Sequence, residues 1–358
     1  EHPYVKGKIR EFSIDIVPCY KVKSAANIKS AVDRTPFHNR YITSNLKPRM
    51  SDDVRLLKQL CKATDIYGSD VKTMGFSGYL CELLIINYKT FKSLINNAKK
   101  WKTGTFIDIE NRFDLDDPKS FFEKEPLIVI DPTDPRRNVS AALSVENFAK
   151  FVNVCSDFSK SPSEKMFEID RRNISRKTFN NYMKKRGTQM FAVKFNRPNV
   201  VDDVLWSQMR RTTSRLVTLA NEYEFKVFSN SVWSDEKQSI LLLEMKTWNL
   251  SETQRLIGPP VASKKHADEF INKYGRKNIY TEGDKWAVTV KRKYRDFDKL
   301  LKDFLSRSNK KLLDDGIRSH IAKSMHKKFN VMKNDDIAKF IDNTSFSIFL
   351  RKYFERRA

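Results

Sequence analysis

An aspartate stands in the middle of a predicted strand near the start of the sequence. In FSIDIVPCY (residues 12–20), Phe12, Ile14 and Ile16 recur with the period of two that is typical of a half-buried strand. A strand would hold Asp15 rigidly. Two interpretations stay open. One is an edge-strand carboxylate paired with a nearby Lys or Arg; the other is a metal ligand, because phosphoryl and nucleotidyl transfer need carboxylates that hold two divalent ions at a fixed separation.

A second group of polar side chains lies in SAVDRTPFHNRYI, residues 30–42. A hydroxyl, an imidazole and two guanidinium groups occur within seven residues there, on Arg34, Thr35, His38 and Arg40. Such a set could grip a triphosphate through charge-assisted hydrogen bonds. A helix cap with solvated charges is the alternative.

Two further positions could contact phosphate. Lys58 lies beside the apolar stripe of a predicted helix, and Tyr67 belongs to the DIYG segment at 65–68. The simpler interpretation of Lys58 is a side chain that buries its stem and keeps its ammonium group in water.

The stretch DPTDPRRNVSAAL, residues 131–143, combines a rigid turn with two arginines. Two Asp-Pro pairs frame the predicted turn, and we expect a helix to begin at Arg136-Arg137-Asn138, where it would favour an anion. Arginine and asparagine can make paired hydrogen bonds to base edges or phosphates. A capped surface turn is the alternative.

The overall charge indicates the class of partner. The chain has 358 residues, with 68 Lys and Arg against 44 Asp and Glu, for a net charge of +24. Such an excess predicts a polyanionic partner, nucleic acid first and a membrane surface second. No apolar run approaches the roughly 20 residues that a membrane-spanning helix needs. Basic tracts that could follow phosphates, each of which alone is usually a solvated face, lie at 184–186, 210–211, 291–293 and 326–328.

The four cysteines are scattered, without a CxxC pair, at positions 19, 61, 81 and 155. This spacing does not favour a metal site. We interpret them as reduced core thiols and expect a cytoplasmic protein.

The elements that would position these side chains change in kind along the chain. Residues 9–17 read as a strand, helical spacing begins near residue 28, and 45–53 reads as a linker. Helices follow from residue 54, at 75–88, which is apolar nearly all round, and at 91–101. A polar loop at 111–125, a short strand at 126–130 and a helix at 144–159 precede an expected domain boundary at 161–165.

Beyond that boundary, strands and helices alternate. We expect strands at 190–195, 225–228 and 240–245, helices at 201–223 and 264–274, and a hairpin at 279–290 that turns at 282–284. An amphipathic helix at 297–305 leads into a basic helical tail. The alternation from 190 to 290 predicts a split β-α-β sheet platform.

Taken together, the ordered series of segments resembles one family. FSIDIVPCY, AVDRTPFH, VRLLK, DIYG, GFSGYLCELLI, IDPTDPRRNVSAALS and LIGPPV (256–261) follow one another along nearly the whole chain. The series is similar to that of the archaeal, class I CCA-adding enzymes, the CCA tRNA nucleotidyltransferases. The resemblance implies an α+β multidomain protein. Its expected parts are a partial polymerase-β-like nucleotidyltransferase palm at 1–45, a helical neck at 46–162, and an α/β body with a helical basic tail at 163–358 that binds tRNA.

The activity that the resemblance implies is template-independent addition of C, C and A to the 3′ end of tRNA from CTP and ATP, with Mg²⁺ as cofactor. A homodimer is a possible assembly. Two alternatives remain: another template-independent RNA nucleotidyltransferase, such as a poly(A)-adding enzyme, or a non-catalytic tRNA-binding protein without a working palm.

The resemblance also carries roles onto individual positions. Asp15 matches the third metal-binding carboxylate, which makes it the expected catalytic and metal-binding residue. Thr35 and His38 match nucleotide contacts, and Lys58 and Tyr67 match contacts to the triphosphate and sugar. The neck arginine that helps to read the Watson–Crick edge of the incoming base is matched by the second arginine of DPRRN, at position 137.

One departure stands out. The first two carboxylates of the family lie in a DxD motif after a Gly-Ser turn, upstream of the match for Asp15, and this sequence does not contain them. Asp114-Leu115-Asp116 has the spacing but lies in a polar loop, and Gly68-Ser69 lies in the expected neck. We therefore expect about a hundred further residues upstream in the parent protein, the length of a small domain, and no activity from these residues alone.

Overall fold

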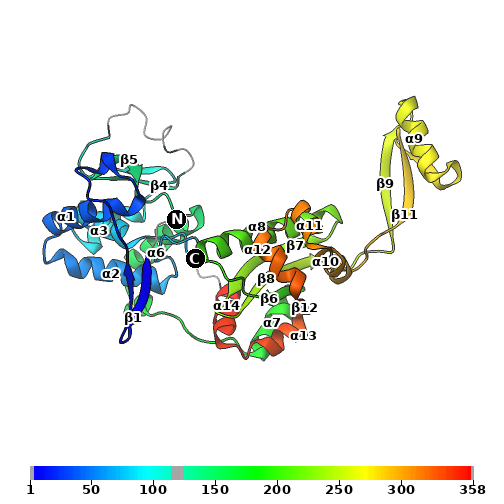
Figure 1. Cartoon of the computed structure of the whole chain (residues 1–358). Coiled ribbons are helices and arrows are strands. Elements are labelled where there is room, and N and C mark those ends of the chain that lie inside the picture. Colours follow the sequence, from blue (N-terminus) through cyan, green and yellow to red (C-terminus); the bar gives the residue numbers. More distant parts are fainter. Residues whose placement is uncertain (1–3, 114–121, 123–124, 356–358) are drawn as a thin grey trace. The chain divides into compact units, whose positions relative to one another are not determined.

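The structure is a computed structural model that describes residues 4–113, 122 and 125–355. The chain divides into two compact units, the first extending to Arg171 and the second beginning at Arg172 (Figure 1). The Asp114-Leu115-Asp116 segment, considered above as a substitute for the missing carboxylates, lies outside the described residues.

The first unit begins with a hairpin of β1 (Val5–Ile9) and β2 (Phe12–Ile16). The predicted strand at 9–17 is therefore interrupted by a turn at residues 10–11. The expectation of a half-buried strand was wrong for this structure: Phe12 and Ile16 are each 64% exposed. Ile14, which lies between them on the strand, is partly buried.

Short 3₁₀ turns at Ala25–Asn27 (η1) and Ala31–Arg34 (η2) lead into helix α1 (Thr35–Asn45). The buried carboxylate of Asp33 ties this connection together, because it accepts hydrogen bonds from the backbone N–H groups of Tyr20, Lys29 and Ser30 at 2.8–2.9 Å. Burial opposes ionisation, but these bonds outweigh it and lower the pKa of Asp33.

Helices dominate the rest of the first unit, as the apolar periodicity predicted. They are α2 (Met50–Ala63), α3 (Gly78–Tyr88), α4 (Phe91–Ala98) and α6 (Val145–Lys160), with η3 (Glu164–Phe167) after them. A small sheet joins β3 (Thr105–Ile107), parallel to β4 (Leu127–Asp131), and β5 (Asp134–Asn138), antiparallel to β4. Met166 and Phe167 pack on this core, so η3 belongs to the first unit.

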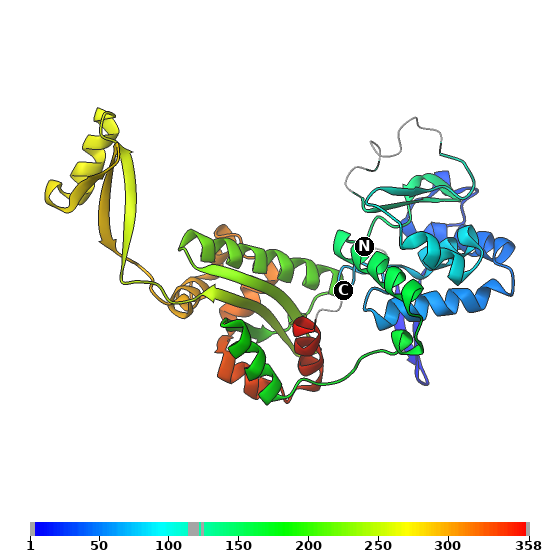
Figure 2. The same cartoon turned by 180° about the vertical axis from the view of Figure 1, so that it is seen from behind.

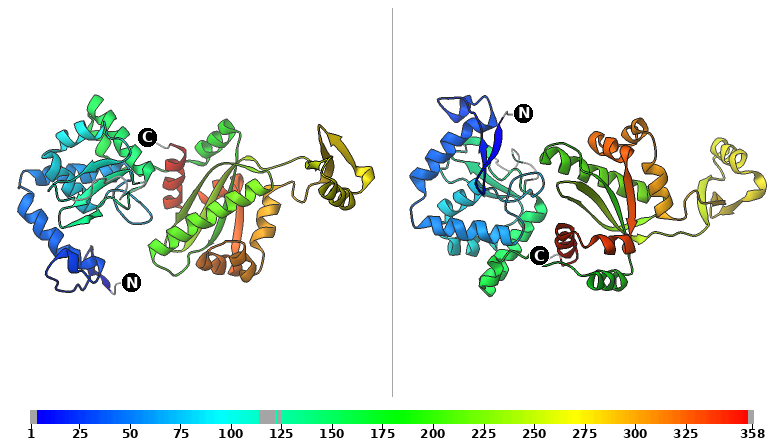
Figure 3. Two further views of the ribbon diagram at one scale, coloured as in Figure 1. Left: turned by 90° about the horizontal axis from the view of Figure 1, so that it is seen from above. Right: turned by 60° about the horizontal axis from the view of Figure 1, so that its bottom comes forward.

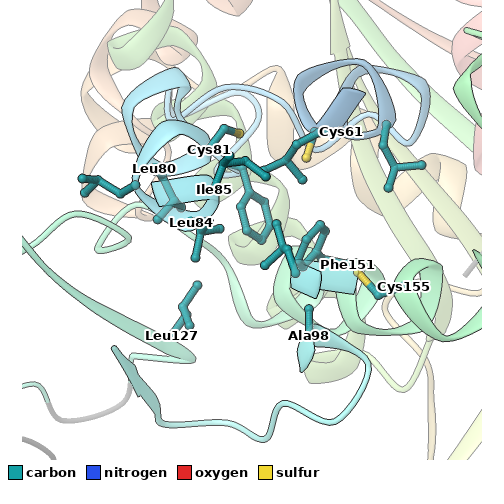
Figure 4. Packing of buried hydrophobic residues seen from close by; sticks show 14 of the residues in the cluster. Cys61, Leu80, Cys81, Leu84, Ile85, Ala98, Leu127, Phe151 and Cys155 are labelled. Atoms are coloured by element: carbon teal, nitrogen blue, oxygen red, sulfur yellow. The ribbon is translucent and has the colours of Figure 1, made fainter. Parts of the chain in front are cut away.

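The core of the first unit gathers around α3, whose apolar run is buried as predicted (Figure 4). Cys61, Cys81 and Cys155 are free, buried thiols of this core. Burial raises the pKa of Cys61 and of Cys155. The prediction of core thiols is wrong for Cys19, which is exposed.

The second unit is a sheet with helices on both faces (Figure 1 and Figure 3). Its strands are β6 (Gln189–Asn196), β7 (Lys226–Ser234), β8 (Gln238–Thr247) and β12 (Phe329–Lys333), in the order β12-β6-β8-β7. Because β8 lies antiparallel between β6 and β7, these strands and the crossover helix α8 (Asp202–Glu222) form the predicted split β-α-β unit.

Alternate residues of β6 and β8 face two different cores, which explains why these strands read as continuous apolar runs. One core is shared with α8, α10 (Phe297–Leu305), α11 (Asn309–Asp314) and α12 (Ser319–Lys327). The other is shared with α7 (Arg176–Arg186), α13 (Asn334–Phe340) and α14 (Thr344–Phe354).

A separate three-stranded sheet is inserted between β8 and α10 (Figure 2). It contains β9 (Thr253–Pro260), β10 (Ile279–Glu282) and β11 (Lys285–Lys291), with α9 (Lys264–Tyr274) and η4 (Arg276–Asn278) before the predicted hairpin. Gly258 of the LIGPPV segment lets the ring of Phe270 approach β9, since a Cβ atom there would lie 2.7 Å from that ring.

Two of the basic tracts are partly internal. Arg186 donates a hydrogen bond to the fully buried carboxylate of Glu244 at 2.9 Å, and Thr188 and Tyr353 donate to the same carboxylate at 2.6 Å. Arg292 forms an ion pair with Glu224. The neighbouring lysines of both tracts are exposed. Within the described part of the chain, no helix is both long and apolar enough to cross a membrane.

Candidate functional site

A cavity of about 740 Å³ lies in the first unit beside the β4–β5 hairpin. Its lining combines cations, hydroxyls, two carboxylates and the rings of Tyr79 and Phe122. The side chains that matter below are Arg34, His38, Ser77, Tyr79, Arg136 and Arg137. They come from η2, α1, β5 and the start of α3, so the cavity exists only when these elements pack together.

The hairpin beside the cavity corrects one sequence expectation. Arg136-Arg137-Asn138 does not begin a helix but forms part of β5, and the residues between β4 and β5 are Pro132 and Thr133. The side chain of Asn138 explains this conformation: its Oδ1 accepts from the N–H groups of Val129 and Ser140 at 2.8 and 2.9 Å, deep in the unit. Asn138 is therefore a structural residue, and the two arginines remain beside the cavity.

Asp131, the last residue of β4, is fully buried and is the centre of the site. Its Oδ2 lies 2.8 Å from Nε2 of His38 and accepts a hydrogen bond of 2.7 Å from Nη1 of Arg137. Its Oδ1 accepts from the hydroxyl of Tyr79 at 3.2 Å, and from the backbone N–H and hydroxyl of Thr133 at 2.9 and 2.8 Å. One carboxylate therefore holds two of the predicted site residues together.

The electrostatics of this cluster follow from its contacts. Burial alone would raise the pKa of Asp131, but the hydrogen bonds and charge of His38 and the bonds from Thr133 outweigh it and hold the pKa well below its usual range. Burial and the adjacent Asp131 carboxylate raise the pKa of the Tyr79 hydroxyl, which stays a donor. The ring of Tyr79 stacks on the imidazole of His38, with centroids 4.0 Å apart and planes at 16°.

Arg34 and Thr35 lie at the junction of η2 and α1. Nε and Nη2 of Arg34 donate to Oδ2 of Asp134 at 3.1 and 3.0 Å, which fastens this junction to β5 at the cavity. Thr35 is exposed at the first position of α1 and does not line the cavity. The role of Thr35 as a nucleotide contact therefore stays a prediction.

Lys58 and Tyr67 meet at the beginning of α3. A Cβ atom added at Gly78 would lie 3.2 Å from the Tyr67 hydroxyl and 3.7 Å from Nζ of Lys58. Nζ of Lys58 forms an ion pair with Glu82 at 2.7 Å. Burial of Lys58 alone would lower its pKa, but the hydrogen bond and charge of Glu82 outweigh this effect and raise the pKa of Lys58. Since Ser77 and Tyr79, the neighbours of Gly78, line the cavity, this pair lies next to it around the first turn of α3.

The backbone conformation that places Tyr67 requires glycine at position 75, in addition to Gly78. Residues 66–68 pair with residues 75–76 through three hydrogen bonds of 2.7–2.8 Å between backbone groups. A Cβ atom at Gly75 would lie 1.9 Å from the carbonyl oxygen of Ile66. The two glycines of GFSG therefore serve close approach: Gly75 to a backbone segment, and Gly78 to the Lys58 and Tyr67 side chains.

Asp15 is exposed on β2, opposite Lys6 in the strand register. No group of three or more His, Cys, Asp or Glu side chains in the described residues could hold a metal ion. A single exposed carboxylate is insufficient for a divalent ion that needs several oxygen ligands. The residues described here do not form a complete metal site.

Sequence reasoning missed Asp131, Tyr79 and Asp134 as members of the site. Asp131 closes an otherwise apolar strand, LIVID, all of which is buried. A carboxylate that ends such a strand must find donors, because an unpaired buried charge is costly. That signal could have singled out Asp131, although not its partners.

The sequence of the chain is similar to those of known proteins. The model of the family described as tRNA nucleotidyltransferase, second domain, matches residues 52–168, and that of the CCA-adding enzyme, C-terminal domain, matches residues 186–334. A protein of Methanosarcina mazei named CCA-adding enzyme is 40% identical over 99% of this chain and 76% of its own length. Proteins of the same name are 35% identical in Methanothermobacter thermautotrophicus, over 94% and 72% of the two chains, and 37% identical in Methanocaldococcus jannaschii, over 85% and 68%.

Proposed function

The chain belongs to the family of CCA-adding enzymes, which are nucleotidyltransferases, and from this premise we propose that it adds C, C and A to the 3′ end of tRNA from CTP and ATP without a nucleic acid template. The observation that carries the proposal is the joint attachment of His38 and Arg137 to Asp131 beside a cavity of about 740 Å³. Two groups able to donate to a nucleotide are thereby held at one place.

We propose that the cavity receives the incoming nucleotide. Arg137, which has 35% of its side chain exposed, faces the base, and His38 contacts the nucleotide from α1. Thr35 does not line the cavity, and we propose that it contacts the part of the nucleotide that extends beyond the cavity. Lys58 and Tyr67, beside the first turn of α3, hold the triphosphate and sugar. An ammonium group and a helix N-terminus both favour anionic oxygens, which supports this orientation.

The reaction proposed is in-line attack of the tRNA 3′-hydroxyl on the α-phosphate with loss of pyrophosphate. Nucleotidyltransferases of this kind depend on divalent metal ions, and we propose Mg²⁺ with Asp15 as one of its ligands. Asp15 alone does not form a metal site among the described residues. The described residues contribute binding and orientation, which lower the barrier by fixing the reacting groups.

The second unit is proposed to hold the tRNA. Exposed lysines of its basic tracts, among them Lys184, Lys185, Lys327 and Lys328, suit contacts to phosphates. Phosphate binding releases counterions, so the association constant should fall steeply as salt rises from about 50 to about 200 mM. An association constant that does not change over this range would contradict the proposal.

Incorporation of labelled nucleotides tests the activity. With the protein and a tRNA that lacks its CCA end, we expect addition of two C residues and one A, and none from UTP or GTP. Long tails from ATP alone would indicate a poly(A)-adding enzyme instead. Binding of tRNA without incorporation would indicate a non-catalytic tRNA-binding protein.

A cytoplasmic location and a homodimer are further parts of the proposal. The location is supported by the free thiols of the core, and the homodimer by the family. Light scattering in solution would measure the mass of the assembly, and a monomeric mass at micromolar concentration would contradict the dimer.

A further inference from the structure

The buried carboxylate of Asp131 uses its full capacity to accept hydrogen bonds. An ionised carboxylate offers about four lone pairs, and Asp131 accepts from Tyr79 and Thr133 on one oxygen, and faces His38 and Arg137 with the other. With 0% exposure it cannot touch a nucleotide in the cavity. Any role of Asp131 in the reaction must act through these partners.

We propose that Asp131 is the positioning residue that sets nucleotide selection, because it fixes the guanidinium group of Arg137 and the imidazole of His38 against one oxygen. The inference rests on the proposed function and adds to it the residue that makes a mobile arginine selective. The last residue of β4 would thus affect nucleotide selection although it is buried and does not contact the substrate.

The chemistry of the bases explains why the arginine must be fixed. A guanidinium group only donates hydrogen bonds. Cytosine and adenine each present a ring-nitrogen acceptor on the Watson–Crick edge, at N3 and N1, where uracil and guanine present an N–H donor. A donor held in one place therefore accepts C and A and rejects U and G, since an unpaired buried polar group is costly.

An unrestrained arginine would lose this discrimination. Its side chain has about 2 kcal/mol of rotamer entropy, and a swinging guanidinium group could reach a carbonyl oxygen of uracil or guanine instead. The bond from Nη1 to Asp131 uses one of the five donors and leaves the others for the base. The Arg137 side chain is 35% exposed, so burial restrains part of it and the bond to Asp131 fixes its guanidinium end.

The same carboxylate joins elements that are far apart in the chain. His38 comes from α1 and lies 93 positions from Asp131, and Tyr79 comes from α3 and lies 52 positions away. Tyr79 stacks on His38 and also donates to Asp131. The two rings and the carboxylate therefore support one another, and loosening the carboxylate should loosen them all.

The test compares nucleotide choice in the complete protein carrying Asp131→Asn, Arg137→Ala or both. The measurement is the ratio of kcat/KM for CTP to that for UTP on tRNA lacking CCA. An amide cannot accept with its nitrogen, so Asp131→Asn should lower the ratio about ten- to hundredfold, the range of a hydrogen bond between charged groups. If Asp131 acts through Arg137, the double variant should have the same ratio as Arg137→Ala alone.

A matched control separates selection from stability. Glu244 is also fully buried and accepts hydrogen bonds from Arg186, Thr188 and Tyr353, but it lies in the second unit. Glu244→Gln should destabilise its unit and leave the CTP-to-UTP ratio unchanged. A ratio that falls as much in Glu244→Gln as in Asp131→Asn would overturn the inference.

Two further results keep the inference falsifiable. Tyr79→Phe retains the ring stacked on His38 and removes only the bond to Asp131, so the ratio should fall a few-fold even if Asp131→Asn does not fold; an unchanged ratio in Tyr79→Phe would refute the inference. If the CTP-to-UTP ratio in the Asp131→Asn, Arg137→Ala double variant falls by the product of the two single losses, the inference is refuted, while the proposed function stands. An unchanged ratio in Arg137→Ala would instead remove the proposed role of Arg137 itself.

Discussion

The loop that places Tyr67 gives the sharpest prediction about this fold. Gly75→Ala would put a Cβ atom 1.9 Å from the carbonyl oxygen and 2.6 Å from the carbonyl carbon of Ile66, and 3.1 Å from the carbonyl oxygen of Gly68. Real Cβ atoms essentially never approach backbone atoms so closely. The two backbone segments must therefore separate.

Their separation costs three backbone hydrogen bonds. They join the N–H of Phe76 to the carbonyl of Ile66, that of Gly75 to the carbonyl of Gly68, and that of Gly68 to the carbonyl of Phe76, at 2.7, 2.7 and 2.8 Å. At about 1 kcal/mol net each, the free energy of unfolding of the first unit should fall by about 3 kcal/mol. The corresponding decrease in Tm is about 6–12 °C for a unit of this size.

Gly78→Ala, three residues further on, is the matched control. The added Cβ atom would meet only the ends of two side chains, the Tyr67 hydroxyl at 3.2 Å and Nζ of Lys58 at 3.7 Å. Alanine favours a helix over glycine by about 0.5–1 kcal/mol. We expect an unchanged or raised Tm together with a higher KM for both CTP and ATP, because the Tyr67 hydroxyl is displaced.

Calorimetry of the two variants and the parent chain measures the effect, and steady-state incorporation measures the KM values. If Gly75→Ala unfolds within about 2 °C of the parent, the 66–76 pairing does not support this unit and the reasoning fails. A Gly78→Ala variant with a lowered Tm would contradict the assignment of that glycine to side-chain clearance.

Three other outcomes are expected. Lys58→Met, which keeps the apolar stem, should raise KM for CTP and ATP by about tenfold each, as loss of a charged phosphate contact predicts, whereas unequal effects on the two nucleotides would contradict a triphosphate role. The pKa of Asp131 is lowered on folding, so the stability that its ionised form contributes is present above about pH 4 and is lost as the pH falls further. Asp131→Asn should therefore make the acid unfolding of the first unit less steep below about pH 4. An acid unfolding transition identical to that of the parent chain would refute this dependence on Asp131. Gly258→Ala, with its Cβ atom 2.7 Å from the Phe270 ring, should loosen the inserted sheet by about 1–3 kcal/mol and speed its proteolysis, and unchanged cleavage between residues 253 and 291 would count against it.

Local patterns determined much of the architecture. The continuous apolar run of α3, the spacing in α8 and the hairpin at β10–β11 were predictable because one element creates each pattern through its own period. The net charge and the order of the motifs likewise pointed to tRNA and to nucleotidyl transfer before any contact was known.

Other features depended on what packs against each element. FSIDI has the alternation of a half-buried strand, yet Phe12 and Ile16 are exposed on the two-stranded ribbon of β1 and β2. Arg136 and Arg137 follow two Asp-Pro pairs that resemble a helix start, but the buried amide of Asn138 draws them into β5. In the first case the strand forms but Phe12 and Ile16 stay exposed. In the second case the tertiary contacts of Asn138 outweigh local propensity.

The centre of the site was decided only by tertiary structure. The sequence by itself singled out His38 and Arg137 as groups suited to phosphate or base, because their chemistry is a property of the residue. Their meeting on Asp131 is not, since it joins positions 93 and 6 residues away on different elements. The physical reason is burial: a carboxylate enclosed at the end of β4 must be paired, and the packing of α1 and β5 against that strand determines with whom.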